Sequence, residues 1–211
     1  MATSDKPIFD KEQRENLTEQ LADLPVAIKF VVKGEHSKEE TKALSDFARA
    51  YAKLAPGFSV KVENTPTEQD APVVELWVDG DPSGVSFCGV PSGKELDSFT
   101  TVVLNAGGKG ENMPDEMLRR RIEKLEGPAY LFTFVSKGCP GCPDVVEAMN
   151  VVSLLNHRFK NMTVDIDAAP DFAKEYGVKS VPAVFANGEL LSLGHASLGQ
   201  LVADLEKRFG S

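Results

Sequence analysis

The chain has 211 residues, 42% of them hydrophobic and 26% charged, and it carries a formal net charge of −9 at pH 7. Because an acidic surface repels phosphate groups, nucleic acid and anionic lipid are excluded as partners. No segment approaches the roughly 20 apolar residues of a membrane span, and the N-terminus is too polar for a secretory signal. We therefore expect a cytoplasmic protein with no membrane partner, long enough for one large domain or two small ones.

The first half of the chain alternates between helical and strand patterns. Apolar residues recur at helical spacing where a helix is expected, and in short runs next to proline or glycine where a strand is expected. A helix that opens at Ser37 has Glu40 three residues later, the pattern of a capping box. The expected elements are a helix at 11–21, a strand at 27–34, a helix at 37–54, strands at 58–62, 73–80 and 84–88, and a helix at about 94–104.

A glycine-rich segment, GGKGENMP at 107–114, precedes a second half with the same order of elements. A strand joined through a helix to a parallel neighbour, then a hairpin and a covering helix, gives a mixed sheet flanked by helices. The expected elements of the second half are a helix at 114–125, a strand at 129–136, a helix at 142–157, a strand at 162–166, a short helix near 171–176, strands at 181–188 and 190–193, and a helix at 198–209.

This repeated pattern is of the α/β class and resembles two thioredoxin folds in tandem. The expected boundaries are residues 1–108 for the first fold and residues 109–211 for the second. A single mixed α/β domain of similar content is the alternative. The sequence does not indicate an oligomeric state.

Two of the three cysteines, Cys139 and Cys142, lie three residues apart in KGCPGCPDVVEAMN, between an apolar strand and a helix. The unpaired N–H groups and the dipole of a helix N-terminus stabilise a thiolate. Cys142 lies one turn further on the same face, so the two sulfurs can form a disulfide. Pro140 suits the first turn of a helix, and Gly141 leaves room for a partner. The arrangement predicts Cys139 as the attacking thiol and Cys142 as the resolving thiol.

The cysteine pair has two alternative interpretations. A zinc site needs two or more further ligands, and the chain offers only Cys88 and three histidines, none of them in a second paired spacing. Two inert buried thiols are the other alternative. The position of the pair between a strand and a helix favours a redox couple over both, and no metal is expected.

A proline enters a later strand at Val181-Pro182. In thioredoxin-like folds the corresponding proline is cis and packs beside the disulfide. The resemblance therefore implies that Pro182 is cis and that the backbone of Val181 is free to pair with an extended substrate peptide. An ordinary trans proline in an edge strand is the alternative.

Longer stretches of sequence narrow the resemblance to one family. SKGCPGCPDVVEAMNVVSLLNHRFKNMTVDID at 136–167 and GVKSVPAVFANGE at 177–189 resemble the second thioredoxin fold in the N-terminal domain of the flavoprotein subunit of bacterial alkyl hydroperoxide reductase. FCGVPSGKELDSFTTVVLNAGGKG at 87–110 is similar to the end of the first fold in that domain. The resemblance thus covers nearly the whole chain.

Membership of that family implies an electron shuttle. The family's N-terminal domain accepts electrons through its CxxC from a thioredoxin-reductase-like portion that binds FAD and NADH, and it then reduces the disulfide of a peroxiredoxin. The resemblance assigns these roles to Cys139 and Cys142. No glycine-rich GxGxxG fingerprint follows a strand, so no bound cofactor is expected in this chain. We expect the flavoprotein reductase on a separate protein, or in a longer chain of which these residues are a fragment.

The chain departs from the family at two further points. It has Pro-Gly between the cysteines where the family commonly has His-Asn, and these residues tune the reduction potential. The first half reads KGEHS at 33–37 where a CxxC would follow its first strand, so that half cannot carry out exchange. Glu95 in SGKEL matches a glutamate that the family places near the active cysteines, and we hypothesise that it modulates proton transfer at Cys139. A solvated acid in the first turn of a helix is the alternative.

Other candidate residues are interpreted as structural. Cys88 is expected in the core, because free cysteine is usually buried. Asp165 and Asp167 alternate with apolar residues, as in a strand with one buried face, and are not interpreted as an acid–base pair. Trp77 is expected in the core of a strand, and no role is assigned to the histidines at 36, 157 and 195.

The sequence thus predicts a cytoplasmic thiol–disulfide oxidoreductase that passes electrons from a flavoprotein disulfide reductase to a peroxiredoxin. One alternative is a general protein disulfide oxidoreductase, similar to the two-fold glutaredoxin-like proteins of thermophiles. Those proteins usually carry a CxxC in each half, which segment 33–37 does not provide. Another alternative is a non-catalytic docking module, whose function would survive replacement of both cysteines by serine.

Overall fold

The structure, a computed structural model, describes residues 7–110 and 113–210, so residues 111 and 112 of the glycine-rich segment lie outside the described residues. Each element predicted from the sequence is present, with ends shifted by a few residues. The first half contains α1 (Lys11–Leu21), β1 (Ile28–Gly34), α2 (Glu39–Ala52), β2 (Phe58–Asn64), β3 (Val73–Val78), β4 (Asp81–Cys88) and α3 (Lys94–Ala106). The second half contains α4 (Glu116–Glu123), β5 (Ala129–Val135), α5 (Cys142–Leu155), β6 (Phe159–Asp165), α6 (Pro170–Glu175), β7 (Ala183–Ala186), β8 (Glu189–Leu193) and α7 (Leu198–Phe209).

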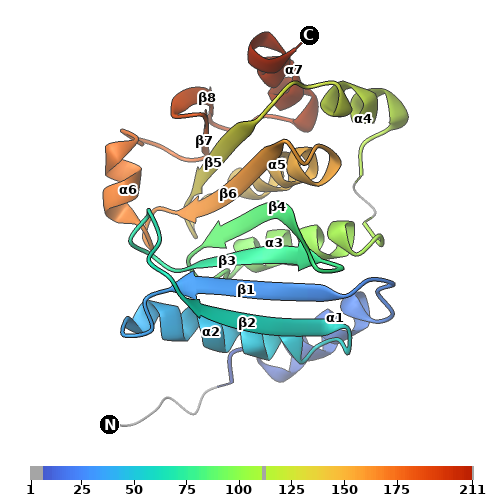
Figure 1. Ribbon diagram of the computed structural model, residues 1–211, viewed down its shortest axis with the longest axis vertical. Helices are drawn as coiled ribbons and strands as arrows, with labels where there is room; N and C mark the ends of the chain where they lie inside the picture. Colours follow the sequence, from blue (N-terminus) through green and yellow to red (C-terminus); the bar gives the residue numbers. More distant parts are fainter. Residues whose placement is uncertain (1–6, 111–112, 211) are drawn as a thin grey trace.

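The strands of the two halves form one continuous sheet (Figure 1). Within the described residues this sheet has eight strands in the order β2-β1-β3-β4-β6-β5-β7-β8. Each half has a parallel pair joined through a helix, β1 with β2 and β5 with β6, and a third strand antiparallel to it. The halves meet where β4 runs parallel to β6, with Cys88 opposite Val164. The predicted fold class, two thioredoxin-like folds with mixed sheets flanked by helices, is confirmed.

The helices begin in different ways. Capping boxes open α1, where Asp10 accepts from the Gln13 N–H, and α7, where Ser197 accepts from the Gln200 N–H. α5 has no side-chain cap but carries a proline, Pro143, in its first turn, and it is buried along most of its length. In residues 7–110 and 113–210, no helix has the length and apolar character needed to cross a membrane.

The capping box predicted for α2 is wrong. The helix begins at Glu39 with Lys38 as its N-cap, and no side chain caps it. The Lys38 N–H donates to the Glu35 carbonyl over 3.0 Å, so a turn carries the chain into the helix. Ser37 lies within this turn, one residue too early to cap.

One face of the sheet carries the core that both halves share. Helices α2, α3 and α5 lie on this face, behind the sheet in Figure 1, with α1 packed against α3, and α4 and α7 packed against α5. The core of the first half also includes Val135, Cys142 and Val146 from the second half. Edge-to-face aromatic contacts fill its centre, formed by Phe30, Phe47, Tyr51, Phe87 and Phe99. The second cysteine of the CxxC is therefore packed into a core built by both halves.

The opposite face of the sheet is covered by α6 only in the second half. Phe172 of α6 packs edge-to-face on Phe132 of β5, and Cys88 lies in the same cluster, 3% exposed, which confirms its predicted core position. Among the described helices, none covers this face of β1 and β3 (Figure 1). There the Lys29 Nζ lies 5.4 Å from the ring centre of Trp77, whose Nε1 donates to Glu75. The prediction that Trp77 lies in the core is wrong, because its strand face is left open to charged neighbours.

Candidate active site

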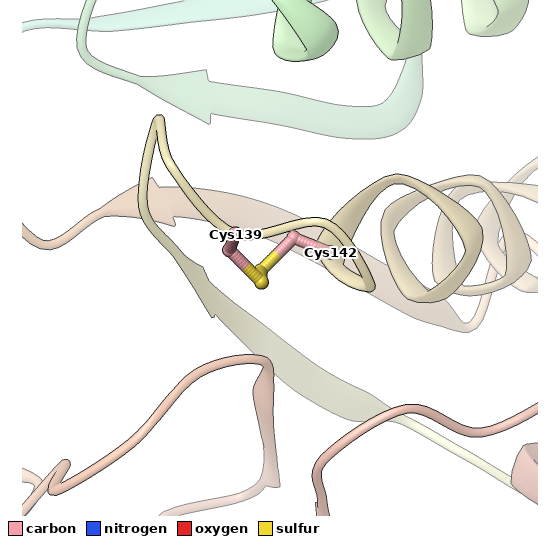
Figure 2. Close-up of a disulfide and its surroundings, with 2 residues drawn as sticks. All are labelled: Cys139 and Cys142. Atoms are coloured by element: carbon pink, nitrogen blue, oxygen red, sulfur yellow. A yellow bond between two sulfur atoms is a disulfide. The ribbon is translucent and has the colours of Figure 1, made fainter.

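The two cysteines of the CxxC form a disulfide, with an S–S distance of 2.15 Å and a Cα–Cα distance of 5.5 Å (Figure 2). Cys139 lies in the turn after β5, where its N–H donates to the Ser136 carbonyl over 3.1 Å, and it is partly exposed. Cys142 is the first residue of α5 and is only 2% exposed. Of the two cysteines, Cys139 is the more exposed.

The start of α5 lies slightly later than the sequence indicates. Its N-cap is Gly141, so Pro140 precedes the helix and is exposed. The first-turn position expected of Pro140 is held by Pro143, where a missing N–H costs no hydrogen bond. The turn at 137–141 thus presents Cys139 ahead of the helix and leaves Cys142 inside its first turn.

Gly141, between the cysteines, faces His195. The imidazole of His195 comes from the loop between β8 and α7, and its Nε2 lies 2.8 Å from Asp144 Oδ2 in the first turn of α5. A Cβ atom at Gly141 would lie 3.4 Å from the His195 Cβ and 3.6 Å from its Cδ2. The space that the glycine leaves is therefore next to His195.

The proline-entered strand lies beside the same core as the disulfide. The Val181–Pro182 peptide bond is cis, as the family resemblance implies. Pro182 is buried, and its carbonyl accepts from the Gly194 N–H over 2.8 Å. Val181 is partly buried and, like Cys139, packs against the core that includes Cys142.

Glu95, from the first half, belongs to a cluster of charged groups next to the loop that carries Cys139. Burial and the charge of Asp165 raise the pKa of Glu95 to about 7, against a smaller lowering by Lys137. One of its carboxyl oxygens, Oε1, is buried without a hydrogen-bond partner. A fully solvated helix acid would show neither property, so Glu95 lies in a partly buried environment and not on open surface.

Asp165 is a further member of this cluster, although its pattern in the sequence indicated only a strand residue. It is 3% exposed at the end of β6, and its carboxylate lies 3.6 Å from the Lys137 Nζ. Its position at the carboxyl end of a parallel strand is the signal that could have identified it as a site residue. Strands β4, β6 and β5 are parallel neighbours, so Cys88, Asp165 and the loop before Cys139 follow at one edge. Sites in α/β proteins form at such carboxyl ends.

Cys88 is close to this cluster but chemically inert. Burial and the charge of Asp165 raise the pKa of the Cys88 thiol to about 12, so it is protonated at neutral pH. In the parts of the chain that the structure describes, no group of three or more His, Cys, Asp or Glu side chains is placed to hold a metal ion. The thiol chemistry is therefore concentrated at Cys139 and Cys142.

The chain is similar in sequence to a known domain family and to several known proteins. A thioredoxin domain family model matches residues 132–206, the part that holds the CxxC and Pro182. The AhpF subunit of alkyl hydroperoxide reductase from Xanthomonas campestris pv. phaseoli is 34% identical over 138 residues, which are 65% of this chain and 26% of that protein. The chain spans about a quarter to a third of the length of the curated relatives it matches. A CxxC disulfide in a thioredoxin domain supports thiol–disulfide oxidoreductase activity.

Two solved structures share the tandem architecture. The crystal structure of the NTD_N/C domain of alkylhydroperoxide reductase AhpF from Enterococcus faecalis (V583) superposes with a TM-score of 0.84 at 28% identity, covering 93% of this chain and 99% of that one. A protein disulfide oxidoreductase from Aeropyrum pernix K1 superposes with a TM-score of 0.79 over 95% of each chain, but its 20% identity indicates the fold alone. The chain is homologous, over nearly its whole length, to the N-terminal tandem thioredoxin-fold domain of the AhpF proteins of alkyl hydroperoxide reductase.

Proposed function

We propose that the chain is a thiol–disulfide electron carrier that takes electrons from an FAD- and NADH-binding disulfide reductase and passes them to a peroxiredoxin. The observation that carries the proposal is the Cys139–Cys142 disulfide at the junction of two thioredoxin-like folds, in a chain related to the AhpF proteins of alkyl hydroperoxide reductase. In this proposal residues 1–108 form the fold without a CxxC, and residues 109–211 form the fold that carries it.

Exchange begins when the reductase adds two electrons and two protons to the bridge. The Cys139 thiolate then attacks one sulfur of the peroxiredoxin disulfide, a bond between those sulfurs forms, and the other peroxiredoxin sulfur leaves and takes up a proton. The Cys142 thiolate next attacks the Cys139 sulfur, which restores the internal disulfide and releases the second peroxiredoxin thiol. The partial exposure of Cys139 and the 2% exposure of Cys142 support this order of attack.

Glu95 is proposed to exchange the protons that accompany these steps at Cys139. A carboxyl group with a pKa of about 7 can both donate and accept a proton near neutral pH, which is the requirement for general acid–base work. Replacement of Glu95 by Gln should change the pKa of the Cys139 thiol, measured by thiolate absorbance in the reduced protein. An unchanged thiol pKa would contradict the proposed role of Glu95. It would leave the proposed roles of Cys139 and Cys142 as they are.

The partner peptide is proposed to lie along Val181 and Pro182, beside Cys139. Support comes from the resemblance to thioredoxin-like folds and from the packing of Val181 and Cys139 against the same core. Pro140 and Gly141 complete the proposed set of supporting residues, since the turn that holds them presents Cys139.

A trapping experiment tests the proposal. The C142S variant lacks the resolving thiol, so after reduction and mixing with oxidised peroxiredoxin it should accumulate a covalent adduct through Cys139. The C139S variant should form none, as judged by non-reducing electrophoresis and peptide mass spectrometry. An adduct formed equally by C139S would contradict Cys139 as the attacking thiol. Full activity of the double serine variant would favour a docking module and contradict electron transfer.

The general oxidoreductase alternative is tested by its breadth of substrates. Reduced protein is mixed in parallel with oxidised peroxiredoxin and with insulin, and the loss of protein thiols is followed in time. We expect the peroxiredoxin to be reduced much faster, because docking supplies orientation that a non-cognate disulfide lacks. Comparable rates for the two substrates would favour the general oxidoreductase.

A further inference from the structure

His195 occupies a place at the disulfide that the proposed exchange does not use. Its ring lies in van der Waals range of the position that a side chain would take at Gly141, the residue next to Cys142. Its Nε2 is held 2.8 Å from Asp144 Oδ2. The pairing with Asp144 ties the loop after β8 to the first turn of α5, so the imidazole is held beside the CxxC although more than half of its side chain is exposed.

The charge at this place acts on the sulfur chemistry. Reduction of the disulfide leaves a thiolate at Cys139, and a cation nearby stabilises that thiolate, while an anion does the opposite. Histidine is the side chain that ordinarily changes charge between about pH 5 and pH 8. When the imidazole is protonated, the His195–Asp144 pair is neutral overall. When it is not, the negative charge of Asp144 is left uncompensated in the first turn of the helix.

We propose that His195 is a positioning residue of the redox couple, which favours the Cys139 thiolate through its protonated imidazole and through compensation of Asp144. The inference rests on the proposed function, since it makes the rate of thiol–disulfide exchange sensitive to the charge of the pair.

Other charged groups surround the couple from different elements. On α5, Glu147 follows Asp144 by one turn, and burial, with the charges of Asp144 and Asp97, raises the pKa of Glu147. The second charged cluster comes from other segments and consists of Glu95 on α3 with Lys137 and Asp165. His195 contacts only Asp144 among these acids in the interactions found for the described residues. Its effect is therefore separable from theirs by substitution.

The test measures the rate of iodoacetamide alkylation of Cys139 in the reduced protein alone, by peptide mass spectrometry, from about pH 5 to about pH 9. This rate follows the thiolate fraction. H195Q should react about threefold more slowly than the wild-type protein near pH 6, the order of effect expected of one charge at a solvated position. The two rates should converge towards the alkaline end of this range, where a histidine side chain ordinarily carries no charge.

Three further variants fix the interpretation. H195K keeps a cation and should restore the fast rate, and should hold it above the pH at which the wild-type advantage disappears. D144N removes the anion and should speed the reaction, opposite in sign to H195Q. H157Q is the matched control, because His157 is an exposed histidine in the turn before β6, at the other end of the parallel strands from Cys139, and it should leave the profile unchanged.

Two outcomes would overturn the inference. A profile of H195Q equal to those of wild type and H157Q would show that the imidazole does not reach the thiolate. A slowing of H195Q by the same factor at every pH, not restored by H195K, would show a purely structural role. Because no partner protein is present in this assay, either outcome leaves the transfer of electrons to a peroxiredoxin to be decided by the trapping experiment.

Discussion

Glu95 of the first half and Asp165 of the second half lie close enough that the charge of Asp165 contributes to raising the pKa of Glu95 to about 7. The half of the chain that has no CxxC thus supplies an ionisable group to the surroundings of the CxxC in the other half. The shared sheet makes this possible, because β4 pairs in parallel with β6 and brings the carboxyl ends of both strands to one edge.

The raised pKa of Glu95 makes the stability of the fold depend on pH. Between its ordinary value of 4.5 and about 7, the folded protein holds a proton that the unfolded chain releases, so stability falls as pH rises through this window. E95Q removes the effect. We expect the free energy of unfolding of E95Q, relative to wild type, to rise by roughly 1–2 kcal/mol from about pH 5 to about pH 8, after allowance for the partial exposure of the side chain.

Urea unfolding at the two pH values measures this difference. E39Q is a suitable control, because Glu39 is an exposed acid in the first turn of α2. Its stability relative to wild type should be the same at both pH values. A constant offset between E95Q and wild type across the window would contradict the perturbed carboxyl.

The charges of Asp165 and Lys137 should shift the titration of Glu95 in opposite directions. D165N removes a negative charge, so the pKa of Glu95 should fall, whereas K137Q removes a positive charge, so it should rise. Carbon-13 NMR of the glutamate carboxyl groups follows both changes directly. No shift in either variant would mean that burial alone, and not charge, determines the pKa.

Cys88 should be silent towards thiol reagents in the folded protein. Its thiol is buried and has a pKa of about 12, so its alkylation should be at least about a hundredfold slower than that of Cys139. Mass spectrometry of the reduced protein after brief alkylation, with and without urea, compares the sites. Labelling of Cys88 without urea at the rate of Cys139 would refute its burial.

Asn156 holds the end of α5 to the end of α4. Its Nδ2 donates to the Ile122 carbonyl over 2.9 Å and to the Leu125 carbonyl over 3.0 Å, and the residue is 7% exposed. N156A leaves both carbonyls buried without this donor, so we expect a loss of about 2–3 kcal/mol in unfolding free energy. Urea unfolding measures this loss, and H157A, a change at the neighbouring exposed residue, is the control. Equal stability of N156A and H157A would count against the role of Asn156.

The order of helices and strands was predictable because the signals that define it are local. Proline and glycine end elements through their own backbone geometry, and apolar spacing identifies a helix or strand within a few residues. The position of the CxxC after an apolar strand is equally local, and so is its interpretation as a redox couple. The prediction of a capping box at Ser37 was wrong for a reason that is also local, because the turn from Glu35 to Lys38 moves the start of the helix to Glu39.

The surroundings of the disulfide were decided only by the tertiary structure. Asp144 and His195 are 51 positions apart in the sequence, and no motif links them, yet the loop after β8 places them 2.8 Å apart. In the sequence Asp165 has the pattern of an ordinary strand residue. In the structure the pairing of β6 with β4 and β5 buries it beside Lys137. Local preference determines which elements form, whereas burial and charge act through space. The sequence alone therefore identified the Cys139–Cys142 redox couple, whereas the packing of the two halves determined which charged groups surround it.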